Sequence, residues 1–342
     1  MASDLQTRIL DFIHGRAADE PFDALALEAY RFQYERNPVY RAYCDRHPPV
    51  RCWQDIPAVP TRAFKDFPIA CFPVAEAVAE FHTSGTTSEN AGKHFFKTLD
   101  LYHAAIRPTF HAALLLPGEP RLPMLALTPS PDEAPHSSLA HMLGLVMREF
   151  GTTDSDFFVT DGHLETDRLV RALCEAQWAH QPVCLLGTAF AFVHLLDHCA
   201  ATGLRLELPE GSRVMETGGF KGRSREVPPA ELYALIQHHL GVSWIVNEYG
   251  MTELSTQFYS RPHTRKTTPP WARVQILNPR DGKPTAPGQT GMIRVLDLAN
   301  LWSSICIQTE DLGVAHADGF EVLGRATDAE ARGCSLTAET FR

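Results

Sequence analysis

Residues 183–201 read VCLLGTAFAFVHLLDHCAA, and they set the architecture predicted for the chain. The apolar run Val183–Leu186 predicts a buried strand, and Phe190–Ala201 has the length and pattern of an amphipathic helix. The same alternation continues on both sides, with strands predicted at Met124–Leu127, Phe157–Thr160, Val214–Thr217 and Trp244–Val246 and helices at Leu101–Leu115, Ser138–Phe150, Glu165–His180 and Pro229–Leu240. This alternation predicts an α/β fold whose largely parallel sheet is covered by helices on both faces.

The segments on either side of this core have different patterns. Residues 1–80 predict a helical N-terminal cap: a helix capped by Ser3 or Asp4, an amphipathic run from Phe22 to about Tyr43, and Ile56–Thr61, where two prolines argue against a regular element. Residues 271–342 predict a β-rich subdomain with a short tail, and its strands are expected at Arg273–Leu277, Met292–Leu296, Ile305–Gln308 and Phe320–Leu323. The chain is therefore expected to have three parts, 1–80, 81–270 and 271–342.

Composition argues against several functional classes. The 342 residues include 31 basic and 41 acidic side chains, so the net charge of −10 disfavours a broad nucleic-acid or anionic-membrane surface. No apolar run reaches the roughly 18 residues of a membrane span, and the N-terminus lacks the pattern of a signal peptide. The eight cysteines include no CxxC pair, which favours reduced thiols and a cytoplasmic location over a disulfide framework or a zinc ribbon.

Residues 81–88, FHTSGTTS, are a candidate phosphate-binding loop. Hydroxyls and backbone N–H groups in such a loop can bind phosphate oxygens, and Lys93 follows to supply positive charge. The spacing is not that of a Walker A loop, which requires glycine in place of Thr87 and Ser or Thr in place of His94. A surface turn rich in Ser and Thr is the alternative interpretation.

Two further motifs follow predicted strands. Residues 246–253, VNEYGMTE, are expected at the carboxyl end of a strand, where open α/β sheets bind ligands. Their tyrosine, threonine and two glutamates suit base stacking, phosphate contact and a metal carboxylate. The third motif is Thr309-Glu310-Asp311, followed later by Gly324-Arg325. Taken singly, each motif also fits a polar loop or a capped turn.

The order of these motifs along the chain resembles that of the adenylate-forming enzymes, which include acyl- and aryl-CoA ligases. Within that superfamily the chain most resembles the acyl-protein synthetases, the ligase component of the bioluminescence fatty-acid reductases, and more distantly phenylacetate–CoA ligase. Residues 59–65, VPTRAFK, and 216–223, ETGGFKGR, also resemble this branch. The resemblance implies a nucleotide- and acid-binding core in residues 81–270, and it implies that the mobile C-terminal lid domain usual in the superfamily is absent after Arg325.

The resemblance implies roles for the matching residues. The loop that closes on the ATP phosphates would be formed by Thr83, Ser84, Gly85, Thr86, Thr87 and Ser88, with Lys93 as its lysine. Gly218 and Gly219 would lie against the adenosine, Tyr249 would stack on the adenine, and Gly250 would also belong to the ATP site. Thr252 would contact the α-phosphate, and Glu253 would hold Mg²⁺.

The same resemblance extends to the ribose, to the acid and to a thiol. Asp311 would accept both ribose hydroxyls, and Arg325 would reach the ribose or a phosphate. His141 resembles the histidine lining the carboxylate pocket, although a single helical histidine is often structural. Cys334, eight residues before the last residue and next to Gly333, matches the acyl-accepting cysteine of the acyl-protein synthetases.

The activity that the resemblance implies is an AMP-forming ligase that uses ATP and Mg²⁺. It would convert a carboxylic acid, expected to be a fatty acid, into an acyl-adenylate, with Thr252 and Glu253 serving catalysis, and transfer the acyl group to Cys334. A partner acyl-thioester reductase would then accept the acyl group. Two alternatives remain: an acyl- or aryl-CoA ligase or loader of a carrier-protein thiol, in which Cys334 is incidental, and a nucleotide-binding protein without activity.

Overall fold

The computed structural model describes residues 2–17, 20–83, 91–119, 121–218, 227–261 and 264–326. The chain divides into two compact units, one built from Met1–Ile106, Met251–Phe258 and Arg265–Arg342 and the other from Arg107–Gly250 and Tyr259–Thr264. These units divide the chain differently from the three parts expected from the sequence, because the N-terminal helices and the C-terminal strands belong to one unit. Among the described helices, none has both the length and the apolar character needed to cross a membrane.

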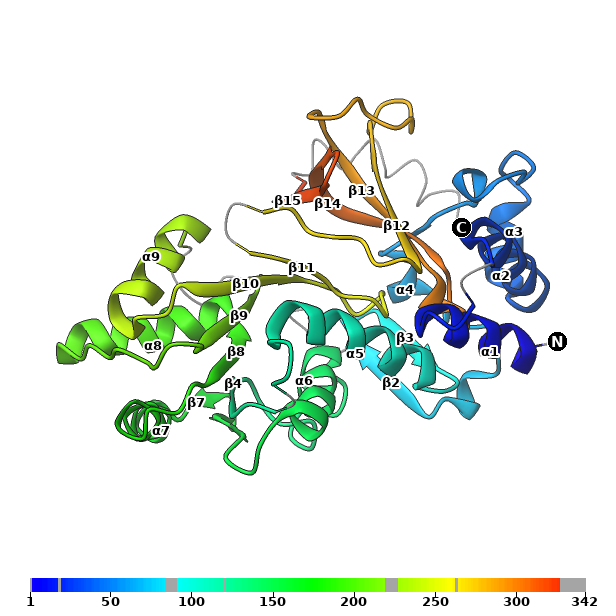
Figure 1. The fold of residues 1–342 in the computed structure, drawn as a ribbon. Helices are drawn as coiled ribbons and strands as arrows, with labels where there is room; N and C mark the ends of the chain where they lie inside the picture. The colour runs from blue at the N-terminus through cyan, green and yellow to red at the C-terminus, as the bar shows by residue number, and fades with distance from the viewer. Residues whose placement is uncertain are drawn as a thin grey trace. The chain divides into compact units, whose positions relative to one another are not determined.

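The second unit is built on a six-stranded sheet in the order β11-β10-β9-β8-β4-β5 (Figure 1). Its strands are β4 (Met124–Leu127), β5 (Asp156–Phe157), β8 (Cys184–Thr188), β9 (Arg213–Thr217), β10 (Trp244–Tyr249) and β11 (Phe258–Ser260). Neighbouring strands from β5 to β10 pair in parallel, which confirms the prediction. The crossovers that parallel pairing requires contain α6 (Ser138–Phe150), α7 (Thr166–Trp178), α8 (Ala189–Thr202) and α9 (Pro229–Leu240).

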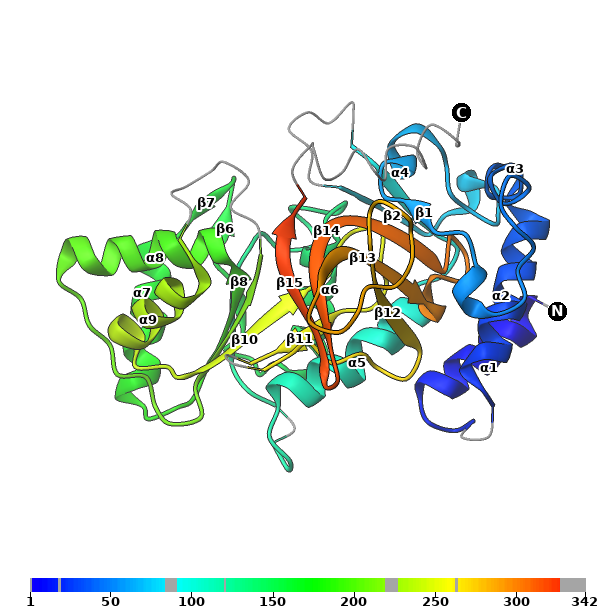
Figure 2. The same ribbon diagram turned by 90° about the horizontal axis from the view of Figure 1, so that it is seen from above.

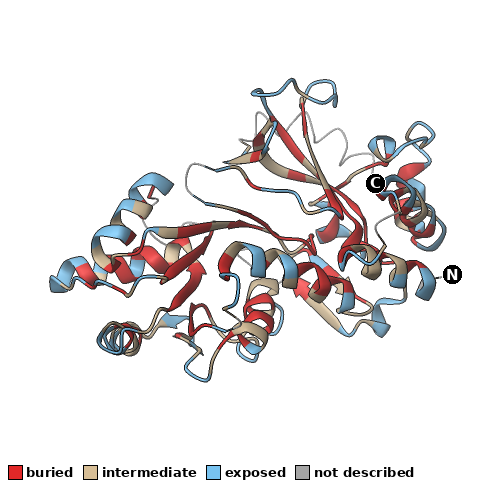
Figure 3. Ribbon diagram, viewed as in Figure 1, coloured by how far each residue is buried: buried red, intermediate tan, exposed pale blue. Residues whose placement is uncertain are grey.

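The main core of this unit lies between the sheet and three helices. Leu173 of α7, Phe192 of α8 and Ile236 of α9 are fully buried together with sheet residues such as Leu185. Figure 2 shows α7, α8 and α9 gathered beside the sheet, and Figure 3 shows that the strands are buried while the outer turns of these helices are exposed. The predicted pattern of strand and helix thus reflects burial of one helix face against the sheet.

The first unit contains a five-stranded sheet in the order β1-β14-β13-β12, with β15 beside β14. Its strands are β1 (Val59–Pro60), β12 (Ala272–Leu277), β13 (Thr290–Asp297), β14 (Cys306–His316) and β15 (Gly319–Arg325). The pairs from β12 to β15 are antiparallel, as a β-rich segment with short turns predicts. Because β14 has 11 residues, the Thr309–Asp311 motif lies inside this strand and not after it.

The N-terminal helices are α1 (Ala2–Ile13), α2 (Phe22–Arg36), α3 (Pro38–Cys44) and the short α4 (Ala63–Asp66). Two expectations for this region are wrong. The predicted caps Ser3 and Asp4 lie within α1, which begins at Ala2. The proline-rich stretch contains β1, because Pro60 needs no N–H at the sheet edge and the next N–H, that of Thr61, donates to Gln308 O at 3.1 Å.

Buried hydrogen bonds join the N-terminal helices to the β-rich part. The Gln33 amide of α2 donates to the carbonyl oxygens of Asn300 and Leu301 and accepts from the Ile305 N–H. Short 3₁₀ helices lie at Trp53–Asp55, Val74–Glu76 and Leu298–Asn300. The two regions therefore form one unit because the Leu298–Ile305 backbone needs the helical part to satisfy its polar groups.

The remaining elements include two small hairpins. β2 (Ala79–His82) pairs with β3 (Lys93–Phe96), and β6 (Val159–Thr160) pairs with β7 (His163–Leu164). The single strand predicted at Phe157–Thr160 is therefore two strands in different sheets. Helix α5 (Asp100–Leu114) follows the β2–β3 hairpin, and the strand predicted at Trp244–Val246 continues to Tyr249.

Candidate active site

Glu253 is a buried carboxyl group in the turn Met251–Leu254, which we call the Thr252 turn; its Leu254 N–H donates to the Met251 carbonyl. Burial raises the pKa of Glu253 from 4.5 to about 7, and the nearby charges of Glu310 and Asp311 raise this pKa as well. The backbone N–H of Glu253 and the Arg325 guanidinium act in the opposite direction. A desolvated carboxyl beside other acidic groups is the oxygen-donor environment that a hard divalent cation requires.

Asp297 and Asn300 hold the segment that includes and follows Glu253. The buried Asp297 carboxylate accepts from the N–H groups of Ser255 and Thr256 at 3.0 and 2.8 Å. The Asn300 side-chain amide donates to Glu253 O at 2.7 Å and accepts from Ser255 Oγ at 2.6 Å. Because both residues come from the end of β13 and the turn after it, they connect Glu253 to the β-rich sheet.

The β2–β3 hairpin contacts the other side of the Thr252 turn. Thr252 Oγ1 donates to His82 O at 3.2 Å, and the His94 ring bonds to Thr252 O through Nδ1 at 2.7 Å. At the loop end of the hairpin, Thr83 N donates to Gly92 O and Gly92 N donates to Thr83 Oγ1, both at 2.8 Å. The hairpin that begins and ends the hydroxyl-rich loop is therefore joined directly to the Thr252 turn.

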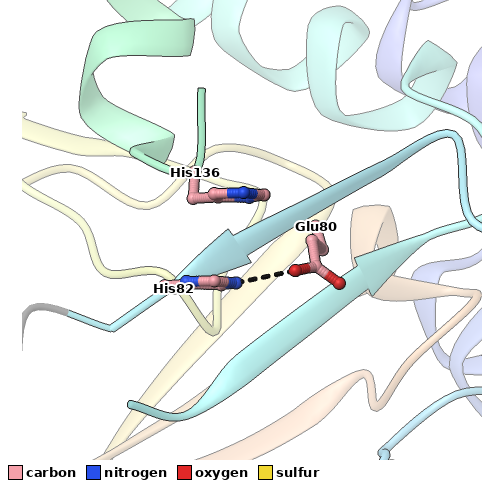
Figure 4. Close-up of side chains that lie close together, drawn as sticks. All are labelled: Glu80, His82 and His136. Carbon is pink, nitrogen blue, oxygen red and sulfur yellow. Dashed lines mark hydrogen bonds and ion pairs between the residues drawn. The ribbon is translucent and has the colours of Figure 1, made fainter. Parts of the chain in front are cut away.

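Lys93 is the first residue of β3, and its ammonium lies 3.6 Å from Glu80 Oε1. Figure 4 shows the second partner of that carboxylate, His82, whose Nε2 lies 2.8 Å from the same oxygen. Glu80 and His82 point to the same side because they are two residues apart on β2. Lys93 is therefore half-exposed and ion-paired on the hairpin.

Asp311 and Arg325 face each other across the β14–β15 pair. The preceding residue, Glu310, forms a 2.6 Å ion pair with Arg62, which lies just before α4. Sequence patterns gave Arg62 no role, although it falls in the 59–65 segment that resembles the family. The structure thus gathers Glu253, Asp311 and Arg325 in one unit and adds Arg62.

Gly218, Tyr249 and Gly250 lie in the second unit, at the carboxyl ends of β9 and β10. Tyr249 is 9% exposed, whereas Gly218 is exposed. Below them, the Thr217 hydroxyl donates to Glu248, and the Glu216 carboxylate accepts from the Tyr233 hydroxyl at 2.8 Å and from Asn247. Buried acidic and hydroxyl groups therefore support the strand ends where ligands bind in parallel sheets.

His141 lies half-buried in α6, also in the second unit. Burial lowers the pKa of its imidazole, and the positive charge of Arg148 lowers it further. Both effects favour the neutral ring, a state that can donate and accept hydrogen bonds. Its role toward an acid stays a prediction. Ser84, Gly85, Thr86, Thr87, Ser88, Gly219 and Cys334 lie outside the described residues.

Four residues of this site were missed by the sequence analysis: Arg62, His94, Asp297 and Asn300. His94 carried a detectable signal, because it alternates with the exposed Lys93 and stands at an inward-facing position of a short strand, where apolar residues are usual. Asp297 ends β13 after an apolar run, and an acidic residue at that position is equally typical of an ordinary turn. The bonds from His94, Asp297 and Asn300 to residues 252–256 join positions 41 to 158 apart in sequence, so no local pattern identifies them.

Comparisons with known proteins show the family of this chain. Residues 12–341 match the family model described as "Acyl-protein synthetase, LuxE". The long-chain-fatty-acid–luciferin-component ligase of Aliivibrio fischeri is 24% identical over 336 residues, which cover 92% of this chain and 87% of that protein. The protein of the same name from Vibrio harveyi is 22% identical over 329 residues, covering 90% and 85%.

Solved structures show the same fold. A 2-hydroxyisobutyryl-CoA ligase in an open conformation, solved in complex with 2-HIB-AMP and CoA, has a TM-score of 0.67 and 15% identity. The match covers 90% of this chain and 70% of that ligase. The structural likeness therefore establishes an adenylate-forming ligase fold.

Proposed function

This chain belongs to the acyl-protein synthetase family, and from that premise we propose that it uses ATP to activate a long-chain fatty acid and transfers the acyl group to its own Cys334. The fatty acid is proposed because both curated relatives are named as long-chain-fatty-acid ligases. A separate acyl-thioester reductase is the proposed partner that consumes the acyl group.

The observation that carries the proposal is the buried Glu253 carboxyl beside Asp311 and Arg325. The raised pKa of about 7 means that the protein stabilises the negative charge of this buried carboxylate poorly. A bound cation would stabilise that charge. Mg²⁺ held there would neutralise negative charge on phosphate oxygens. Asp311 would orient the nucleotide through its ribose hydroxyls, and Arg325 would add positive charge nearby.

The proposed reaction has two balanced steps. In the first, a carboxylate oxygen of the acid attacks the α-phosphorus of ATP, a new P–O bond forms, and pyrophosphate leaves with the cleaved bond's electron pair. In the second, the Cys334 thiolate attacks the acyl carbon, and AMP leaves as the C–O bond breaks. Activation is needed because a free carboxylate is a poor electrophile for a thiol.

A single experiment tests this function. The full chain is incubated with ATP, MgCl₂ and carboxylic acids of graded chain length, and ATP–pyrophosphate exchange and intact protein mass are measured. We expect exchange that depends on a long-chain acid and a mass increase equal to one acyl group. Acyl-CoA formed only when CoA is added, with no protein adduct, would identify a CoA ligase instead. If neither exchange nor an adduct is seen, the chain is a nucleotide-binding protein without this activity.

Asp311→Ala is expected to weaken ATP binding about tenfold or more. The lost carboxylate would have accepted two charge-assisted hydrogen bonds from the ribose, each worth about 1.5–3 kcal/mol, and 1.4 kcal/mol corresponds to tenfold in affinity. Calorimetric titration with ATP measures the change. Asp318→Ala is the matched control, because it removes the same charge from an exposed turn of the same sheet. Equal ATP affinity in the two variants would mean that Asp311 does not contact the nucleotide.

A further inference from the structure

His94 is a buried polar side chain within an aromatic cluster of the first unit. It is 1% exposed, and its ring centroid lies 4.3 Å from that of Phe96 and 5.6 Å from that of Phe64. A polar ring in such surroundings lowers stability unless it is hydrogen-bonded. Its bond to Thr252 O provides this partner, and because a carbonyl only accepts, Nδ1 carries the proton and donates. Burial also lowers the pKa of His94 to about 4, so the ring is neutral at physiological pH.

This bond reaches across the chain to the residue before Glu253. The Thr252 carbonyl belongs to the same planar peptide unit as the Glu253 N–H, so fixing that oxygen fixes the plane from which Glu253 begins. Thr252 is also bonded through its hydroxyl to His82 O. The hydroxyl and the carbonyl of Thr252 are thus held by the two strands of the β2–β3 hairpin.

The next peptide is fixed from the opposite direction. Asn300 donates to Glu253 O, and Asp297 binds the two N–H groups that follow Leu254. Glu253 therefore stands between two anchors, the hairpin before it and the β-rich sheet after it. The hairpin anchor connects the residue before Glu253 to both β2 and β3, through His82 O and His94 Nδ1.

We propose that His94 is a positioning residue of the adenylation site, which orients the Thr252–Glu253 peptide relative to the β2–β3 hairpin through its Nδ1–H bond to Thr252 O. This inference rests on the proposed function, because the reaction that His94 would affect is the proposed formation of an acyl-adenylate. His94 contacts no substrate in this proposal. His94 acts on Glu253 through the backbone. Its loss should therefore lower kcat and the gain in ATP affinity given by Mg²⁺ more than it lowers ATP binding without Mg²⁺.

Two substitutions separate this role from simple packing. His94→Phe keeps an aromatic ring against Phe64 and Phe96 but removes the donor. His94→Asn loses the ring but keeps an N–H near the place of Nδ1. Three quantities are measured for each variant and for the wild type: the ATP dissociation constant with MgCl₂ and with EDTA, kcat and KM for ATP in acid-dependent pyrophosphate exchange, and the urea midpoint of unfolding.

In His94→Phe we expect kcat to fall about tenfold, with KM for ATP changed less than about threefold. The gain in ATP affinity that MgCl₂ gives over EDTA should also fall about tenfold. In His94→Asn both quantities should return to within about threefold of the wild type, even if its urea midpoint is the lower of the two. A structural role alone would instead make both losses follow the urea midpoint.

Two results with the variants would overturn the proposal. One is wild-type behaviour of His94→Phe in both kcat and the Mg²⁺-dependent affinity. The other is an equal loss in the Asn and Phe variants, which would assign the effect to ring packing. If the wild type binds ATP with Mg²⁺ but shows no acid-dependent exchange, the proposed function fails, whereas the affinity measurements still decide the role of His94. If the wild type shows no Mg²⁺-dependent gain in ATP affinity, the positioning role itself is refuted.

Discussion

Glu253→Gln is expected to reduce acid-dependent ATP–pyrophosphate exchange about a hundredfold or more. The amide keeps the size of the side chain but removes the negative charge that would hold Mg²⁺ against the phosphates. Loss of that ion removes several kcal/mol of transition-state stabilisation, and each 1.36 kcal/mol is tenfold in rate. Exchange is measured at saturating ATP across a range of MgCl₂ concentrations.

The matched control is Glu207→Gln, the same change at a side chain that is 70% exposed in the other unit. It should retain the exchange rate of the wild type. Near-normal exchange in Glu253→Gln would remove Glu253 from the metal-binding role. Recovery of the variant at high MgCl₂ would instead support a weakened cation site.

The same variant should gain stability relative to the wild type as pH rises. Folding raises the pKa of Glu253 from 4.5 to about 7, so the folded state holds its proton more tightly. The wild type therefore loses up to about 3 kcal/mol of stability as pH rises through this window, and glutamine, which does not titrate, avoids that loss. Urea unfolding of both proteins at pH 5 and pH 8, without nucleotide, measures the difference. A difference that is the same at both pH values would contradict this burial cost.

Cys334→Ser is expected to keep acid-dependent ATP–pyrophosphate exchange while losing acylation of the protein completely. Adenylation requires only the nucleotide and acid sites, whereas a thioester requires a thiol nucleophile. The readouts are exchange and hydroxylamine-labile label from a radioactive fatty acid. The two steps are thereby measured on the same variant.

Cys174→Ser is the matched control, since Cys174 is a free, exposed cysteine on α7. It should keep both exchange and labelling. If Cys334→Ser still acquires hydroxylamine-labile label, another cysteine accepts the acyl group. If the wild type is never labelled but forms acyl-CoA rapidly, the self-acylation proposal is replaced by a CoA ligase.

The α/β core could be predicted because its signal is local. Helices α6 and α9 begin and end at the predicted residues, and β4 does as well, because apolar periodicity records which face of an element is buried. The ends of other elements were less predictable. β10 continues to Tyr249 because its partner β9 extends the parallel ladder to Thr217, opposite Glu248, and this pairing outweighs the polar residues of the motif.

The candidate site divides in the same way. The residue types in the Thr252 turn and in β14 indicate nucleotide chemistry from sequence alone, since their order along the chain matches a known family. The raised pKa of Glu253 could not be predicted from the sequence, because it comes from burial, which the fold imposes. The pairing of Arg62 with Glu310 likewise joins residues 248 positions apart.

Local periodicity and motif order were thus sufficient for the alternation of strands and helices, for the parallel sheet and for the family. The contacts of His94 and Asn300 with the Thr252 turn, and of Asp297 with the two residues after it, required the tertiary structure. The physical reason is that periodicity reports which side of an element is buried but not which partner satisfies a buried polar group. That partner is brought near only when the β2–β3 hairpin and the end of β13 pack around Glu253.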